Sequence, residues 1–204
     1  MYIDSFIKEN DVKKIIFGIL IITMVSLVYS AIFAQNTNTG KSKTLIVFYS
    51  KTGHTREVAN IIREITKADI AEIEVVNPYP VKYRETTAQA KKELESGYLP
   101  PIKQSAALNG KNLAAYDTII ICSPIWWHTI SLPVRTFLSQ NKLAGKKVAL
   151  LTTHGGDGMG NSVSDLGIFC PQAKILDSLT LRDYKVKKSQ KEIEGWLKKI
   201  GLVN

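Results

Sequence analysis

The stretch "IVFYSKTGHTREVANII", residues 46–62, indicates a buried strand, a short turn rich in hydroxyl groups and an amphipathic helix. The segment "TLIVFY" (44–49) is apolar, with β-branched and aromatic side chains, as is typical of a strand buried on both faces. Apolar residues then recur at helical spacing, at Val58, Ile61, Ile62 and Ile65. A strand followed directly by an amphipathic helix is the first half of a βαβ unit.

The same alternation continues to the end of the chain. Further strands are expected at 70–76, which alternates like an edge strand, and at 117–123, 146–153 and 173–181. Helices are expected at 83–95, from Ser131 with Pro133 near its start, from about Ser162, and around Ile193, Trp196, Leu197 and Ile200. Five strands that alternate with helices predict an α/β, doubly wound, three-layer fold with a parallel sheet.

Residues 15–34, "IIFGILIITMVSLVYSAIFA", form an uncharged and mostly apolar run preceded by Lys13 and Lys14. The run is long enough to cross a hydrocarbon core, and its small residues near Ala34 also suit a cleaved signal peptide. The sequence therefore predicts that residues 1–34 are a signal peptide or an N-terminal membrane anchor. A polar linker (35–42) follows, and residues 43–204 are expected to form one domain. The protein is expected to be exported or membrane-anchored.

The chain carries 27 Lys and Arg against 18 Asp and Glu, a net charge of +9. Such a charge favours anionic ligands, anionic lipid or an acidic partner, and no nucleic-acid motif accompanies it. Of the two cysteines, Cys122 lies in an apolar strand and is expected to be a packed thiol, whereas the pattern around Cys170 leaves a disulfide open.

Three loops of unusual composition follow predicted strands: "SKTGHT" (50–55), "SPIWWHT" (123–129) and "THGGDGMGNS" (153–162). In an open parallel sheet, ligands bind beyond the carboxyl ends of the strands. The three loops are therefore expected to meet at one binding site.

The first loop has the donors of a phosphate site. Ser50, Thr52 and Thr55 supply hydroxyls, Gly53 lets the backbone approach closely, and the helix that begins near His54 adds free amides and a favourable dipole. The spacing of a nucleotide P-loop is absent. An ordinary hydroxyl cap of a helix is the alternative interpretation.

The other two loops suit a flat ring. Trp126 and Trp127 follow Pro124 at a strand end, where indoles either complete a core or stack on a planar ligand. The third loop has four glycines in six residues, so its backbone amides can come close to a ring, although a merely flexible loop would have the same composition.

Together, "YSKTGHT", "SPIWWHTISLPVRTFL" and "THGGDGMGNS" resemble the flavodoxin superfamily, specifically small flavodoxin-like proteins with a Pro-x-Trp-Trp loop. The resemblance covers residues 43–201 and includes the insertion at 77–104. It implies a five-stranded sheet in the order 2-1-3-4-5, non-covalent binding of FMN, and redox chemistry at the flavin ring.

The resemblance also implies which residues contact the cofactor. The phosphate loop corresponds to Ser50, Lys51, Thr52, Gly53, His54 and Thr55. The two loops beside the ring correspond to Pro124, Ile125, Trp126 and Trp127, and to His154, Gly155, Gly156 and Asp157. His128 stands where many relatives have a small residue, and it either donates a proton to the reduced ring or points to solvent.

The predicted function is that of an FMN-binding redox protein whose partner is another redox protein or a small acceptor such as a quinone. Three alternatives stay open: an electron carrier, an NAD(P)H-dependent quinone reductase, and a flavin-free binding module of the same fold. The basic charge and the expected export depart from the acidic, cytoplasmic electron carriers of the family.

Overall fold

The computed structural model describes residues 43–204, apart from 106–107, 109 and 142. The segment predicted to be a signal peptide or anchor (1–34) and the predicted linker (35–42) lie outside the described residues. Within the described ranges, no helix is both long and apolar enough to span a membrane.

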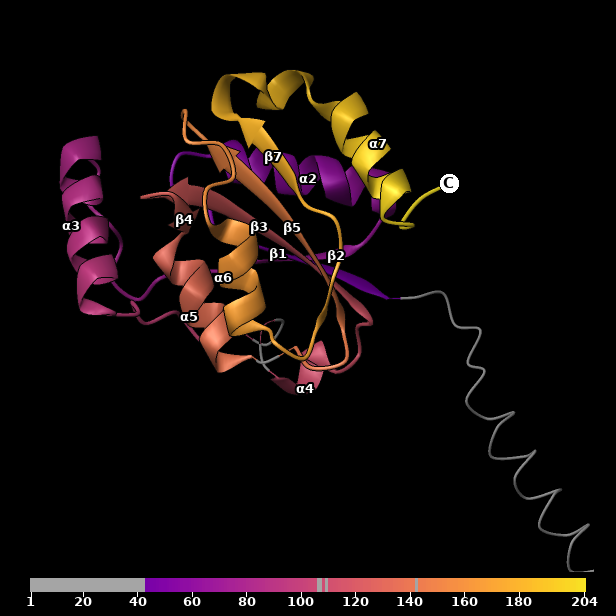
Figure 1. The fold of residues 1–204 in the computed structure, drawn as a ribbon, viewed down its shortest axis with the longest axis horizontal. Helices are drawn as coiled ribbons and strands as arrows, with labels where there is room; N and C mark the ends of the chain where they lie inside the picture. The colour runs from indigo at the N-terminus through magenta and orange to yellow at the C-terminus, as the bar shows by residue number, and fades with distance from the viewer. Residues whose placement is uncertain (1–42, 106–107, 109, 142) are drawn as a thin grey trace, which may run out of the picture. The chain divides into compact units, whose positions relative to one another are not determined.

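A twisted, mostly parallel sheet forms the centre of the domain (Figure 1). Its strands are β1 (Thr44–Phe48), β2 (Asp69–Glu72), β3 (Thr118–Trp126), β4 (Thr129–Ile130), β5 (Lys147–His154), β6 (Lys174–Ile175) and β7 (Leu179–Arg182). The order is β2-β1-β3-β5-β6, β7 also pairs with β5, and β4 runs antiparallel to β3. The doubly wound fold is thereby confirmed.

The sheet differs in detail from the predicted five strands in the order 2-1-3-4-5. The strand expected at 173–181 is divided into β6 and β7, which both pair with β5. The strand expected at 70–76 ends at Glu72, because the following residues turn to pair with the end of the insertion, where Val75 bridges Ile102. The antiparallel β4 was not predicted, since two residues carry no periodicity.

Helices cover both faces of the sheet. The described helices are α2 (His54–Thr66), α3 (Tyr83–Ser96), α4 (Gly110–Leu113), α5 (Leu132–Gln140), α6 (Ser162–Phe169) and α7 (Gln190–Lys199), and a 3₁₀ helix, η2, spans Asp183–Lys188; α3 lies to one side of the sheet. Helices α2 and α7 lie on one face, and α5 and α6 on the other (Figure 1).

The sheet has one hydrophobic core on each face, and alternate side chains of each strand contribute to one core or the other. In β1, Leu45 and Val47 belong to the core under α5, whereas Ile46 and Phe48 belong to the core under α2 and α7. The same division holds in β3 and β5, because successive side chains of a strand point to opposite faces. A sheet buried on both faces leaves only its edges and the ends of its strands for function.

Both cysteines are free and buried. Cys122 belongs to the core under α2, and Cys170 to the core on the opposite face of the sheet, so no disulfide joins them. Burial raises the pKa of the Cys170 thiol to about 11 and that of Cys122 further still, which keeps both protonated. The predicted packed thiol at Cys122 is confirmed.

Candidate functional site at the carboxyl edge of the sheet

The loops after β1, β3 and β5 meet at the carboxyl edge of the sheet, as predicted. The hydroxyls of Thr55, in the first turn of α2, and Thr153, near the end of β5, lie 2.8 Å apart. The amide of Asn161 donates to the carbonyl of His128 at 2.7 Å. The first contact joins the first loop to the end of β5. The second contact joins the third loop to the second loop.

The first loop presents free donors at the start of α2. Gly53 has φ 98°, a left-handed conformation that suits glycine, and its amide donates to the Ser50 hydroxyl at 3.1 Å. Within the described domain, no side chain caps the first turn of α2. The N–H groups of that turn therefore remain available, with the helix dipole, for an anionic group.

The other side chains of this loop have protein partners. Thr55 is 2% exposed and is held by Thr153. Oγ1 of exposed Thr52 lies 3.1 Å from Nδ1 of His54. The Lys51 ammonium donates to the carbonyl of Tyr79 at 3.2 Å. Backbone amides, together with Ser50 and Thr52, thus form the accessible part of the predicted phosphate site.

The second loop is a two-residue turn between β3 and β4. Trp126 pairs with Thr129, and the two residues between them, Trp127 and His128, have φ of 51° and 62°. Two successive positive φ angles define a type I′ hairpin turn, which normally contains Asn and Gly. A bulky residue in this conformation costs roughly 1–2 kcal/mol, so other contacts must hold the turn.

The third loop supplies one of these contacts. At Gly160 (φ 52°), an added Cβ would lie only 2.2 Å from the carbonyl oxygen of His128 and 2.7 Å from its carbonyl carbon. Only glycine allows this approach. The backbone of the Gly-rich loop therefore lies directly against the strained turn.

A polar network lies below the turn. The Arg135 guanidinium pairs with the Asp165 carboxylate at 3.1 Å, and these side chains are only 18% and 13% exposed. The Thr129 hydroxyl donates to Asp165 and accepts from Arg135, and Arg135 Nε also donates to the carbonyl of Ile130. The network ties β4 to α5 and α6, and it fixes the second half of the hairpin.

Both tryptophans face the insertion rather than the third loop. Trp126 packs edge-on against Tyr79 and Tyr49, with ring centroids 4.8 Å and 5.6 Å away. The Trp127 indole donates to the carbonyl of Thr87 in α3 at 2.9 Å, and the Lys91 ammonium lies 5.3 Å from its ring centre. Trp127 is 43% exposed. Their stacking on a cofactor stays a prediction.

The insertion is itself anchored by a buried carboxylate. Glu93 of α3 is 7% exposed and accepts hydrogen bonds from the Tyr79 hydroxyl and from Gln89. Burial and the adjacent Glu93 raise the pKa of Tyr79, so the phenol stays protonated and donates. The second loop thus rests on α3, which is held by this polar contact.

His154 shapes the third loop. Its Nδ1 accepts the amide of Gly158 at 3.0 Å, which requires an unprotonated nitrogen. Burial and then the nearby Arg182 lower its pKa, so the imidazole is neutral at neutral pH. Gly155 and Gly156 lie exposed beside Arg182 and Asp183, and Asp157 is also exposed. Among the described residues, no group of three or more His, Cys, Asp or Glu could hold a metal ion.

Five residues at the site were not predicted from the sequence: Tyr79, Glu93, Arg135, Asp165 and Arg182. Arg182 directly follows the strand run "LTL", so its place at a strand end was a usable signal. The others lie in helices or in the insertion, and no local pattern marks a side chain that meets a loop distant in sequence.

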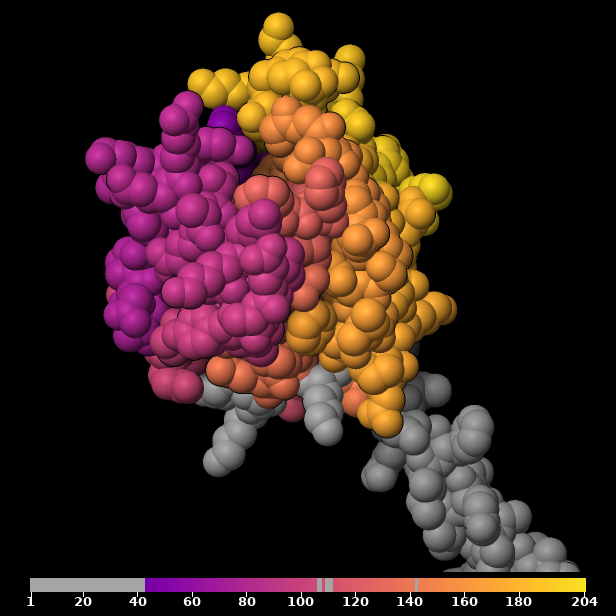
Figure 2. Space-filling view, turned by 60° about the vertical axis from the view of Figure 1, so that its left-hand side comes forward, coloured from indigo at the N-terminus to yellow at the C-terminus, as the bar shows by residue number. Residues whose placement is uncertain are grey.

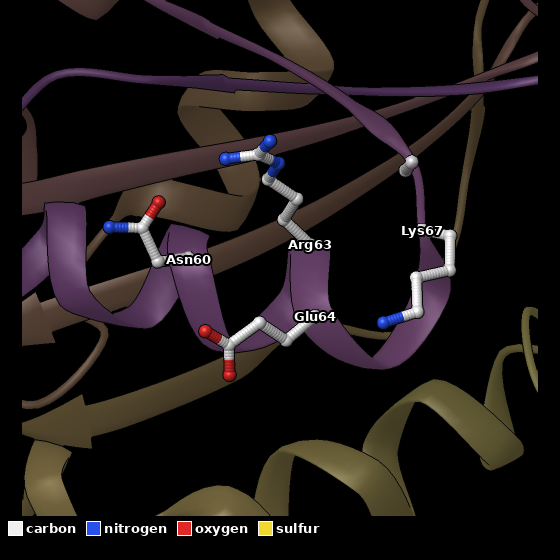
Figure 3. Close-up of a pocket in the computed structure, with 5 residues that line it drawn as sticks. Asn60, Arg63, Glu64 and Lys67 are labelled. Atoms are coloured by element: carbon white, nitrogen blue, oxygen red, sulfur yellow. The ribbon is translucent and has the colours of Figure 1, made fainter.

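A separate pocket lies on the exposed side of α2, lined by Asn60, Arg63, Glu64, Lys67 and Ala68 (Figure 3). These residues lie between the middle of the helix and the residues just after it, roughly 10–22 Å from Gly53 at 1.5 Å per residue. Its labelled side chains are exposed, and they do not converge on one point. We therefore place the functional site at the carboxyl edge of the sheet.

Comparison with known proteins identifies the family of this chain. Residues 43–200 match the flavodoxin family. This chain belongs to that family. No curated protein sequence matches the chain.

Solved structures of similar proteins agree with this membership. A protein of Bacteroides eggerthii assigned as a flavoprotein is 27% identical, with a TM-score of 0.67 over 78% of this chain and 98% of its own. A flavoprotein of Lactobacillus acidophilus, crystallised in complex with FMN, is 26% identical, with a TM-score of 0.60 over 76% of this chain and 98% of its own. Flavodoxin-like proteins of nearly the domain's full length thus share its fold.

Proposed function

We propose that this chain binds FMN non-covalently at the carboxyl edge of its sheet and transfers electrons through it. The observation that carries the proposal is the uncapped start of α2 behind Gly53, which the contact of Thr55 with Thr153 joins to the end of β5, just before the Gly-rich loop. The FMN complex of the Lactobacillus acidophilus relative supports the choice of flavin.

The donor set fits a phosphate group. Backbone amides of the first turn of α2, with the hydroxyls of Ser50 and Thr52, would bind the phosphate without requiring a cation. The hairpin turn at Trp127–His128 and the loop from Gly155 to Gly158 would flank the flavin ring. When bound, FMN supplies the electron chemistry, and the chain supplies position and access.

His128 suits a role beside the ring. It is exposed, its backbone is fixed by Asn161 and Gly160, and no described side chain is hydrogen-bonded to its imidazole. The side chain is therefore available to hold or donate a proton at Nδ1 or Nε2. We propose that it does so when the cofactor is reduced.

The phosphate site is tested by titrating the purified full chain with FMN and with riboflavin, following flavin fluorescence. The change Thr52→Asp places a carboxylate among the phosphate donors, and we expect FMN affinity to fall at least about tenfold while riboflavin affinity stays unchanged. Asn60→Asp, which adds the same charge to exposed α2 away from the loop, is the control. Equal losses for both flavins would contradict the phosphate site, and an absence of flavin binding would overturn the proposal.

The reaction class is tested with the FMN-loaded chain under anaerobic conditions. An electron carrier is expected to show two resolved steps in the visible spectrum during stepwise reduction and little oxidation of NAD(P)H. Rapid oxidation of NAD(P)H with a quinone as acceptor would instead identify an NAD(P)H-dependent quinone reductase.

A further inference from the structure

Positive charge is concentrated directly after β7. Five cations stand there against one acid, Asp183, within ten residues: Arg182, Lys185, Lys187, Lys188 and Lys191. All five side chains are exposed, and we call them the basic surface. By contrast, α3 on the other flank of the site has equal numbers of acids and bases.

The basic surface adjoins the candidate flavin site. Arg182 is the last residue of β7 and pairs with His154, the residue that fixes the Gly-rich loop. A Cβ added at Gly156 would lie 3.9 Å from Nη2 of Arg182. In Figure 2, the yellow C-terminal segment lies directly above the orange segment that contains this loop.

The fold does not pair these charges with acidic side chains. In the part of the chain that the structure describes, none of the five cations forms an ion pair. By contrast, two lysines at the end of α7 form ion pairs: Lys198 with Glu194, and Lys199 with Asp177. Unpaired like charges side by side repel one another, so an internal role does not explain them.

The backbone that carries the cations is fixed. Val186 of η2 is fully buried under the sheet, and the buried Ser189 donates its hydroxyl to the Val186 carbonyl at 2.7 Å. The lysines therefore project from an ordered scaffold and not from a tail. A rigid basic surface beside a redox centre suits docking of a complementary acidic surface.

We propose that the basic surface docks an acidic electron-carrier protein at the edge of the site; this rests on the proposed function. In each encounter one electron would pass from the iron–sulfur centre of the reduced partner, which is thereby oxidised, to FMN held at the proposed site, which is thereby reduced. An acidic protein is favoured over an anionic lipid surface, because this segment exposes little apolar area that could insert into a membrane. Tyr184 is the only large apolar side chain exposed among the described residues of the segment, and the Arg182 guanidinium lies over its ring.

The test measures binding of an oxidised plant-type [2Fe–2S] ferredoxin, a small and strongly acidic carrier, to the full chain at low salt. The test variant reverses three lysines: Lys185→Glu, Lys187→Glu and Lys188→Glu. The control variant makes the same charge change at the amino edge of the sheet and the far end of α2: Lys67→Glu, Lys147→Glu and Lys174→Glu. We expect the test variant to bind at least about tenfold more weakly and the control less than about twofold.

Equal weakening in both variants would overturn the proposal, because attraction would then come from net charge alone. An absence of ferredoxin binding would also overturn the proposal. If the chain then co-sediments with phosphatidylserine vesicles and needs the same three lysines to do so, the surface binds lipid instead. Binding is measured with and without added FMN. Ferredoxin binding without flavin binding would refute the proposed function and leave the docking surface standing.

Discussion

At the scale of single residues, the candidate site depends on one position, 160, where only glycine is sterically possible, and on two bulky residues held at positive φ. Gly160 lies so close to the His128 carbonyl that any Cβ would overlap it, and its φ is also positive. Trp127 and His128 keep positive φ angles although they are not glycine. The contact with Gly160 is one reason why this unfavourable turn persists.

The change Gly160→Ala should therefore destabilise the domain by about 2–4 kcal/mol, since backbone atoms must move and the φ becomes strained. The measurement is urea unfolding followed by circular dichroism. Gly195→Ala is the matched control: Gly195 is exposed in α7 and a Cβ there meets no atom within 4 Å, so we expect a gain of about 0.5–1 kcal/mol. A loss below about 1 kcal/mol at position 160 would contradict the close approach.

At the scale of elements, the site is held together by contacts between units that are distant in the chain. The hairpin of β3 and β4 is fixed by α5 and α6 through the pair of Arg135 with Asp165, which is mostly buried. The insertion helix α3 holds Trp127 through a backbone carbonyl. The hairpin therefore depends on contacts with three helices, and the local sequence does not identify these contacts.

We expect Asp165→Asn to destabilise the domain by about 1–3 kcal/mol, because it leaves the Arg135 guanidinium without its counter-charge in a mostly buried position. The melting temperature should fall by roughly 3–9 °C for a domain of this size. Glu194→Gln, which breaks the exposed pair with Lys198, is the control and should change it by less than about 2 °C.

The double variant Arg135→Gln/Asp165→Asn separates pairing from packing. If the two charges interact, it should lose less stability than the sum of the single changes. Additive losses would show that the pair is not coupled.

At the scale of the whole molecule, charge and the N-terminal segment set the remaining expectations. The net charge of +9 includes the five cations of the basic surface, none of which has an ion pair among the described residues. Residues 1–34 carry as many acids as bases, which assigns the excess to the rest of the chain.

We expect residues 1–34 to direct the chain to or across a membrane. The full chain is expressed in a bacterial host, the cells are fractionated, and intact masses are measured. A soluble exported form that begins near residue 35 indicates a signal peptide, and a full-length form in the membrane fraction indicates an anchor. A full-length form in the cytosol would contradict both.

The sequence by itself determined the fold and the edge of the sheet at which the three loops meet. Buried strands such as 44–49 and amphipathic helices such as α2 have local periodicities, and loops at the carboxyl ends of parallel strands must share one edge. The short β4 and the division of the last strand had no such signal. Both depend on pairing with distant strands.

Only the tertiary structure decided which side chains complete the site. It directs both tryptophans toward the insertion, engages Thr55 with Thr153, and brings Arg135, Asp165 and Glu93 to support loops far away in the chain. The physical reason is that periodicity records which face of an element is buried. Which partner a buried polar group meets depends on how separate elements pack.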